Sequence, residues 1–99
     1  MLFRSLTATN HAKAYGLYPR KGSIAIGADA DLALWDPNLT RKIRHADLHD
    51  GSDYTPYEGI EITGWPVTTL LRGSVVVDNG KLVAKKGTGA FLQRGRADL

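Results

Sequence analysis

The dipeptide Asn79-Gly80 lies between two apolar runs and constrains the fold of this chain more than any other feature. The flanking runs are Val75–Val77 and Leu82-Val83. Both central positions of a tight two-residue hairpin turn need positive φ, which Asn and Gly adopt with little strain. The pattern therefore predicts antiparallel pairing of strands that are neighbours in the sequence.

Further strand signals precede this hairpin, so we expect five to seven short strands in all. Glycine, proline and polar residues separate them, and Gly73-Ser74 is a plausible second turn. Leu32–Trp35 is apolar on both faces, which is typical of an interior strand covered on two sides. The predicted strands before residue 73 are Ser23–Ile26, Leu32–Trp35, Lys42–Arg44, Ile60–Trp65 and Val67–Arg72.

The two ends of the chain differ from this strand-rich centre. Residues 1–18 predict short helices: Thr9 or Asn10 can cap a second helix, and Gly16 is a natural stop. The last fifteen residues form a basic, glycine-containing stretch without strand periodicity. We therefore predict an α+β, mainly β fold with a helical arm at 1–18, a strand-rich portion at 19–84 and an extended basic tail at 85–99.

Length and composition exclude several classes of protein. With 99 residues the chain is at most one domain, and surface scaling gives a folded area of about 5,500 Å². Because the chain has no cysteine, it has no disulfide, no thiolate zinc site and no cysteine nucleophile. No apolar stretch is long enough to span a membrane and no signal-peptide pattern is present, so we expect a cytoplasmic protein without membrane contact.

Carboxylates and histidines form the two clusters that could carry chemistry. Asp29, Asp31 and Asp36 surround the first buried strand and could bind a cation, but Asp also bonds its own backbone in turns, which is the favoured interpretation. His45 and His49 are spaced as zinc ligands on a helix would be. The glutamate of that motif and any helical periodicity are missing, so a solvated loop is favoured.

Other motifs point to function even less. The segment Gly22–Gly27 lacks the lysine and hydroxyl of a phosphate loop, and no serine lies in a nucleophile elbow. The basic tail carries Lys85, Lys86, Arg94 and Arg96, and the aromatic residues Trp35, Trp65 and Tyr54 could stack on bases. Because these aromatic residues fall on different elements, the pattern does not favour nucleic-acid binding.

Three segments, in order, resemble the C-terminal end of a D-hydantoinase or dihydropyrimidinase of the cyclic amidohydrolase family. The first segment is Asn10–Pro37, within which the run Gly27-Ala-Asp-Ala-Asp-Leu32 on its own indicates only the wider amidohydrolase superfamily. Asp53-Tyr-Thr-Pro-Tyr-Glu-Gly59 and Gly64-Trp-Pro66 narrow the resemblance to the hydantoinase group. The third segment comprises Leu71-Arg-Gly73, Val75–Gly80, Gly87-Thr-Gly89 and Phe91-Leu92. The chain departs from the family pattern at His11, where the family usually has proline after the asparagine.

The resemblance implies an enzyme of several hundred residues that opens a cyclic amide at its C–N bond. Such enzymes carry a (β/α)₈ barrel with zinc, and beside it a small β-sandwich built from both ends of the chain. None of the barrel's metal ligands matches a position here, so the resemblance assigns no catalytic, cofactor-binding or metal-binding residue to this chain. We expect no catalytic barrel, no cofactor in this chain and no ring-opening activity from it alone.

The resemblance also leaves the role of the isolated chain open. The first hypothesis is a non-catalytic β-sandwich and tail portion of a hydantoinase-like hydrolase, with a structural or oligomerisation role. The alternatives are a free-standing assembly or binding module and, less favoured, a nucleic-acid-binding module. Open strand edges and uncovered helices predict a homo-oligomer, or a partnership with a separate barrel subunit.

Overall fold

A computed structural model describes residues 2–98 of the chain. The N-terminal residues are helical, as predicted, and α1 (Leu2–Arg4), the π-helical turn η1 (Ser5–Thr9) and α2 (Asn10–Ala14) follow one another without a break. Gly16 ends the helix with φ of +71°. The predicted cap at Thr9 or Asn10 is wrong, because the residues before it are already helical. The Thr9 hydroxyl instead donates a hydrogen bond of 2.7 Å to the Gly22 carbonyl.

The centre of the chain forms one open antiparallel sheet, which confirms the mainly β fold class. Its strands are β1 (Leu32–Lys42), β2 (Glu61–Leu71), β3 (Ser74–Asp78) and β4 (Lys81–Leu82), in the order β1-β2-β3-β4. The 3₁₀ turn η2 (His45–Asp47) lies in the polar connection between β1 and β2. Every pair of neighbours in the sheet is therefore also consecutive in the sequence.

Two tight turns join the last three strands. Asn79 and Gly80 take φ of +46° and +77°, which confirms the predicted hairpin. The other turn lies one residue earlier than predicted: Arg72 and Gly73 occupy its centre with φ of +48° and +82°, and Ser74 already pairs with Leu71. The Arg72 backbone N–H donates to Asp31 Oδ1 at 2.8 Å, which anchors this left-handed residue from outside the turn.

The strands are fewer and longer than predicted. Ile60–Trp65 and Val67–Arg72 merge into β2, because the register shift between Leu34 and Trp35 accommodates Pro66 opposite Trp35. Pro66 also lies outside the part of β2 that pairs with β3, so its missing N–H removes no bond on that side.

The predicted strand Ser23–Ile26 is wrong. This segment bends instead, and Ile24 remains 81% exposed. No strand among the described residues lies beside it to accept its hydrogen bonds.

Little of the apolar surface is covered. The expectation that Leu32–Trp35 is buried on both faces is wrong for this chain, since Leu34 and Trp35 are each 49% exposed. Ala12 is the one buried hydrophobic residue in the described part of the chain. The accessible area is 8017 Å², compared with about 5,500 Å² for a compact protein of this mass. No helix of residues 2–98 packs its backbone against these strands.

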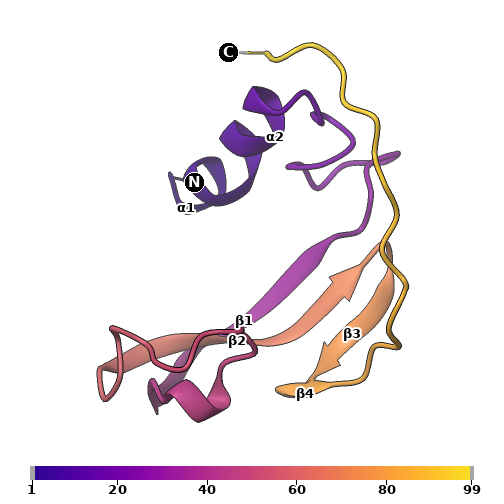
Figure 1. The fold of residues 1–99 in the computed structure, drawn as a ribbon. Coiled ribbons are helices and arrows are strands. Elements are labelled where there is room, and N and C mark those ends of the chain that lie inside the picture. The colour runs from indigo at the N-terminus through magenta and orange to yellow at the C-terminus, as the bar shows by residue number, and fades with distance from the viewer. Residues whose placement is uncertain (1, 99) are drawn as a thin grey trace.

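The helical arm (residues 2–18) and the sheet form two separate layers (Figure 1). A hinge segment (residues 19–31) connects them on one side. The tail (residues 85–98) has no regular secondary structure and returns from β4 along the same side to the end of α2 (Figure 1). This extended course is the one predicted for the tail. No helix in the described part of the chain has the length and hydropathy of a membrane span.

Candidate functional site

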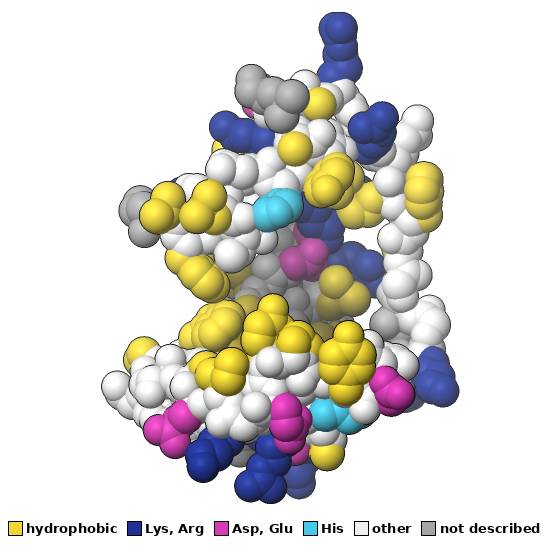
Figure 2. Space-filling view, turned by 60° about the vertical axis from the view of Figure 1, so that its left-hand side comes forward, with side chains coloured by type: hydrophobic (Ala, Val, Ile, Leu, Met, Phe, Trp, Pro, Cys, Tyr) yellow, Lys and Arg dark blue, Asp and Glu magenta, His cyan; other side chains and the backbone are white. Residues whose placement is uncertain are grey.

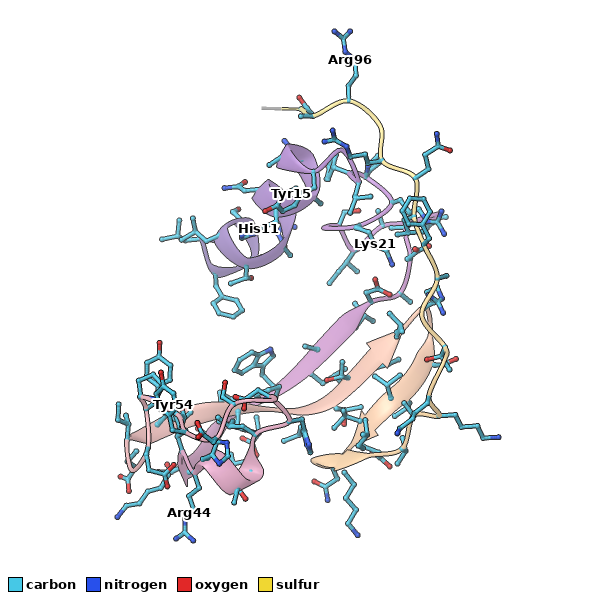
Figure 3. The ribbon with its side chains drawn as sticks, in the orientation of Figure 1. His11, Tyr15, Lys21, Arg44, Tyr54 and Arg96 are labelled. Carbon is cyan, nitrogen blue, oxygen red and sulfur yellow. The ribbon has the colours of Figure 1, made fainter. Side chains whose placement is uncertain are left out.

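Four charged side chains gather on the hinge segment and form what we term the hinge cluster: Arg20, Lys21, Asp29 and Asp31. Asp29 Oδ2 lies 2.9 Å from Arg20 Nε and 2.8 Å from Lys21 Nζ. Lys21 also donates to Asp31 Oδ2. Lys21 thus bridges two carboxylates. Figure 3 shows Lys21 on the segment that connects the arm to the sheet.

The ionic contacts favour the charged forms of Lys21, Asp29 and Asp31. Hydrogen bonds from Lys21 and Arg20 lower the pKa of Asp29 below 3.8. Partial burial works against ionisation of Asp31, but the bonds from Lys21 and the Arg72 amide outweigh it and lower its pKa as well. Burial likewise opposes the ammonium of Lys21, whose two carboxylate partners nevertheless raise its pKa above 10.5. The cluster is an ionic lock rather than an acid–base pair poised near neutral pH.

An apolar groove opens next to the cluster, between the helical arm and β1. The Phe3 ring meets the Trp35 ring edge to face at 5.7 Å between centroids. Figure 2 shows the hollow between the two layers, with hydrophobic side chains along its lower wall. The groove has a volume of about 210 Å³ and is lined by Phe3, Arg4, Thr7, Ala8, Gly22, Ser23, Ile24, Asp31, Leu32, Ala33 and Trp35. Most of the side chains that line it are apolar, so it suits an apolar partner surface.

The aspartates that the sequence singled out do not form one site. Asp29 and Asp31 belong to the hinge cluster, whereas Asp36 accepts a hydrogen bond of 2.9 Å from the Asn38 amide within β1. The structural interpretation predicted contacts with nearby backbone, which Asp36 makes, whereas Asp29 and Asp31 pair with charged side chains. It missed the partners Arg20 and Lys21, whose position beside Gly22 was the available signal.

The histidines also stay apart. The η2 turn ends at Asp47, so His45 and His49 share no helical face, and the loop interpretation is confirmed. His45 Nε2 contacts the Ser52 carbonyl oxygen at 2.6 Å and lies 3.8 Å from Asp50 Oδ1. His11 is exposed on α2 (Figure 3).

These donors do not fit zinc. Residues 2–98 bring no three His, Asp or Glu side chains into one group that could hold a metal ion. A structural or catalytic zinc site needs at least three protein ligands. His45 and Asp50 supply two donors, and one of these is already engaged with a carbonyl.

The basic and aromatic residues are scattered as well. Lys85, Lys86, Arg94 and Arg96 are exposed along the tail, and Figure 3 shows Arg44 and Arg96 pointing away from opposite ends of the molecule. Trp65 stacks under Arg41 at 4.8 Å, while Trp35 faces Phe3 and Tyr54 lies in the connection between β1 and β2. Such an arrangement offers no continuous stacking platform for bases.

Comparison with known proteins identifies the family of the chain. The sequence model of the Amidohydrolase family matches residues 3–76. The chain belongs to the amidohydrolase family. This amidohydrolase chain is 47% identical over 92 residues to a D-hydantoinase from Ralstonia pickettii, an alignment that takes in 93% of the chain and 20% of the relative.

Solved structures agree. A D-hydantoinase structure superposes on 98% of the chain with a TM-score of 0.93 and 44% identity, and the match covers 21% of that protein. The dihydropyrimidinase from Brevibacillus agri NCHU1002 superposes with a TM-score of 0.91 and 38% identity over 98% of the chain and 21% of the other protein. This amidohydrolase chain therefore spans about a fifth of the length of the relatives that it matches.

Proposed function

We propose that these residues are the non-catalytic C-terminal portion of a hydantoinase- or dihydropyrimidinase-like hydrolase acting on cyclic amide C–N bonds. The supporting observation is the mismatch between area and mass: 8017 Å² where about 5,500 Å² is expected. A chain with one buried hydrophobic residue in its described part gains little stability from its own core. Its fold makes physical sense as part of a larger body.

The role that we propose is structural. The remainder of the hydrolase, including its barrel, would pack on the apolar groove and on the β1 residues that line it, Leu32, Ala33 and Trp35. The hinge cluster would keep the arm and the sheet in the relative position that this packing needs. Zinc and the ring-opening chemistry would reside on the remainder of the hydrolase, since the donors in residues 2–98 do not fit the metal.

A reconstitution experiment tests the proposal. The full chain is assayed alone for hydantoin and dihydrouracil opening and for bound zinc, and then with the Ralstonia pickettii D-hydantoinase lacking its matched 92-residue segment. We expect no turnover and no stoichiometric zinc for the chain alone, and restored turnover for the mixture. Turnover by the chain alone that tracks its zinc content would overturn the proposal.

The alternative role as a free-standing assembly module predicts a different result in the same experiment. The chain would form a discrete homo-oligomer and would neither bind nor reactivate the shortened hydantoinase. Size-exclusion chromatography of the mixture separates the two roles, because a complex with the shortened enzyme elutes apart from an oligomer of the chain alone.

A further inference from the structure

The tail is fastened to the sheet at one end and to the helical arm at the other. Near the sheet, the Arg72 guanidinium donates to the Thr88 carbonyl. At the arm, the Gly95 backbone N–H donates to the Gly16 carbonyl at 2.8 Å. Figure 1 shows the tail running from the sheet to the arm on the same side of the molecule as the hinge segment.

The second attachment satisfies the end of a helix. The last carbonyls of a helix lack intrahelical partners and need donors from elsewhere. At the end of α2 the Lys13 carbonyl accepts from the Gly16 amide at 3.2 Å and from the Asp98 amide at 2.9 Å. The tail therefore supplies backbone donors to Lys13 and Gly16 of the arm.

The attachment depends on a close approach of two backbones. A Cβ built on Gly16 would fall on the Gly95 carbonyl group, 2.8 Å from its carbon. A Cβ built on Gly95 would lie 3.6 Å from the Gly16 oxygen, which is an ordinary contact. The site tolerates a side chain on the tail but not on the arm.

The helical arm has little else to fix its distance from the sheet. In the described part of the chain no helix packs its backbone against a strand. The direct contact is the edge-to-face pair of Phe3 and Trp35. The separation therefore depends on the hinge segment and on the tail.

We propose that the tail is a strap, latched at Gly16 and Gly95, that fixes the position of the helical arm over the sheet and so sets the width of the apolar groove. This inference stands independently of the hydrolase role. In this proposal the backbone of residues 95–98 holds the arm in place through its hydrogen bonds, and Gly16 leaves the space that this backbone needs.

Substitution at Gly16 tests the strap in the full chain. Because the chain has no cysteine, Asn10→Cys on the arm and Lys81→Cys on the sheet allow spin labelling at two unique points. Labelled chain is diluted with unlabelled chain to suppress distances between copies. We expect Gly16→Ala to broaden the distance distribution and to speed exchange of the Asp98 amide by about tenfold, the scale of losing the two tail hydrogen bonds.

Two alanine variants provide matched controls. Gly87→Ala places the same left-handed strain in the tail, at φ of +83°, with open space around the new methyl group. Gly95→Ala adds the methyl group on the tolerant side of the latch. Both should keep the narrow distribution and the slow exchange of the parent.

Asp98→Pro removes the N–H that donates to the Lys13 carbonyl and leaves the sequence of the arm unchanged. It therefore tests the strap even if Gly16→Ala fails to fold. It should broaden the distribution as well. The strap is refuted if Gly16→Ala and Asp98→Pro both retain the parent distances, or if Gly87→Ala broadens them as much as Gly16→Ala.

Discussion

Lys21 is the residue on which the hinge depends, because it joins the carboxylates of Asp29 and Asp31. The side chains of Lys21 and Asp29 are 17% and 18% exposed, so water screens these pairs only in part. The bond from the Arg72 amide to Asp31 extends the cluster to the β2–β3 turn. One lysine therefore links the hinge segment to the sheet through a chain of charge-assisted hydrogen bonds.

The hinge cluster predicts a stability that is lost at both extremes of pH. Asp29 and Asp31 have lowered pKa values when folded, so their contribution is present above pH 3.8 and disappears as the pH falls through their folded values. Lys21 has a raised pKa, so its contribution is present below pH 10.5 and disappears as the pH rises through its folded value. Between about pH 5 and about pH 9 the contribution is constant.

Asp31→Asn tests the loss of stability at acid pH. It removes the charge of the carboxylate, while the amide oxygen can still accept the hydrogen bond from the Arg72 N–H. We expect it to lower the free energy of unfolding by less than about 1 kcal/mol at pH 7, since the side chain is 33% exposed. The difference from the parent should shrink below pH 3.8. Urea unfolding from pH 2 to 7 measures it, and a difference that does not change with pH would count against the lock.

At the scale of elements, the hairpin turns determine the register of the sheet. Asn79 and Gly80 both take positive φ, and the Gly80 N–H donates to the Val67 carbonyl of β2 at 2.9 Å. The β3–β4 turn is thereby attached to a third strand. A change of conformation at Asn79 would disturb both the pairing of β3 with β4 and the hydrogen bond from Gly80 to Val67.

Asn79→Ala should lower the free energy of unfolding by about 1 kcal/mol, because alanine pays the left-handed penalty that asparagine largely escapes. Asn79→Gly is the matched control and should remain close to the parent, since glycine takes positive φ freely. Equilibrium urea unfolding compares the three chains. Equal stability of the alanine variant and the parent would contradict the turn assignment.

The sequence predicted those elements whose conformation depends on residues close together in the chain. The Asn79-Gly80 turn, the helical residues before Gly16 and the loop at His45 follow from φ preference, propensity and missing periodicity. Ser23–Ile26 and the coverage of Leu32–Trp35 were mispredicted, because a strand needs a partner and a buried face needs a cover. The described residues contain neither a partner strand for Ser23–Ile26 nor an element that covers Leu32–Trp35, and a local sequence pattern cannot show that these are missing.

The hinge cluster was also beyond local reasoning. Arg20 and Lys21 meet Asp29 and Asp31 only because the segment folds back at Gly22 and Gly27, which take φ of +80° and +90°. The sequence marked the glycines and the aspartates separately, without joining them. The attachment of the tail at Gly16 likewise needed the three-dimensional course of the chain.

At the scale of the whole molecule, the exposed apolar area predicts self-association of the isolated chain. Ile24 and Trp35 line the apolar groove and are 81% and 49% exposed, and exposed apolar patches mark surfaces that bind other surfaces. We expect light scattering to give a mass that rises with concentration. Trp35→Asp should reduce the association, whereas Asn38→Asp adds the same charge at an exposed position of β1 outside the groove and should not. A compact monomer at high concentration would contradict this prediction.

The central claim is that these residues supply scaffold to a hydantoinase-like enzyme and leave its chemistry to the remainder. The most direct measurement replaces the matched 92-residue segment of the Ralstonia pickettii D-hydantoinase with the aligned residues of this chain and follows hydantoin ring opening. We expect the chimera to open the ring with the metal content of its parent. A chimera that folds and holds its metal but leaves the ring closed would contradict it.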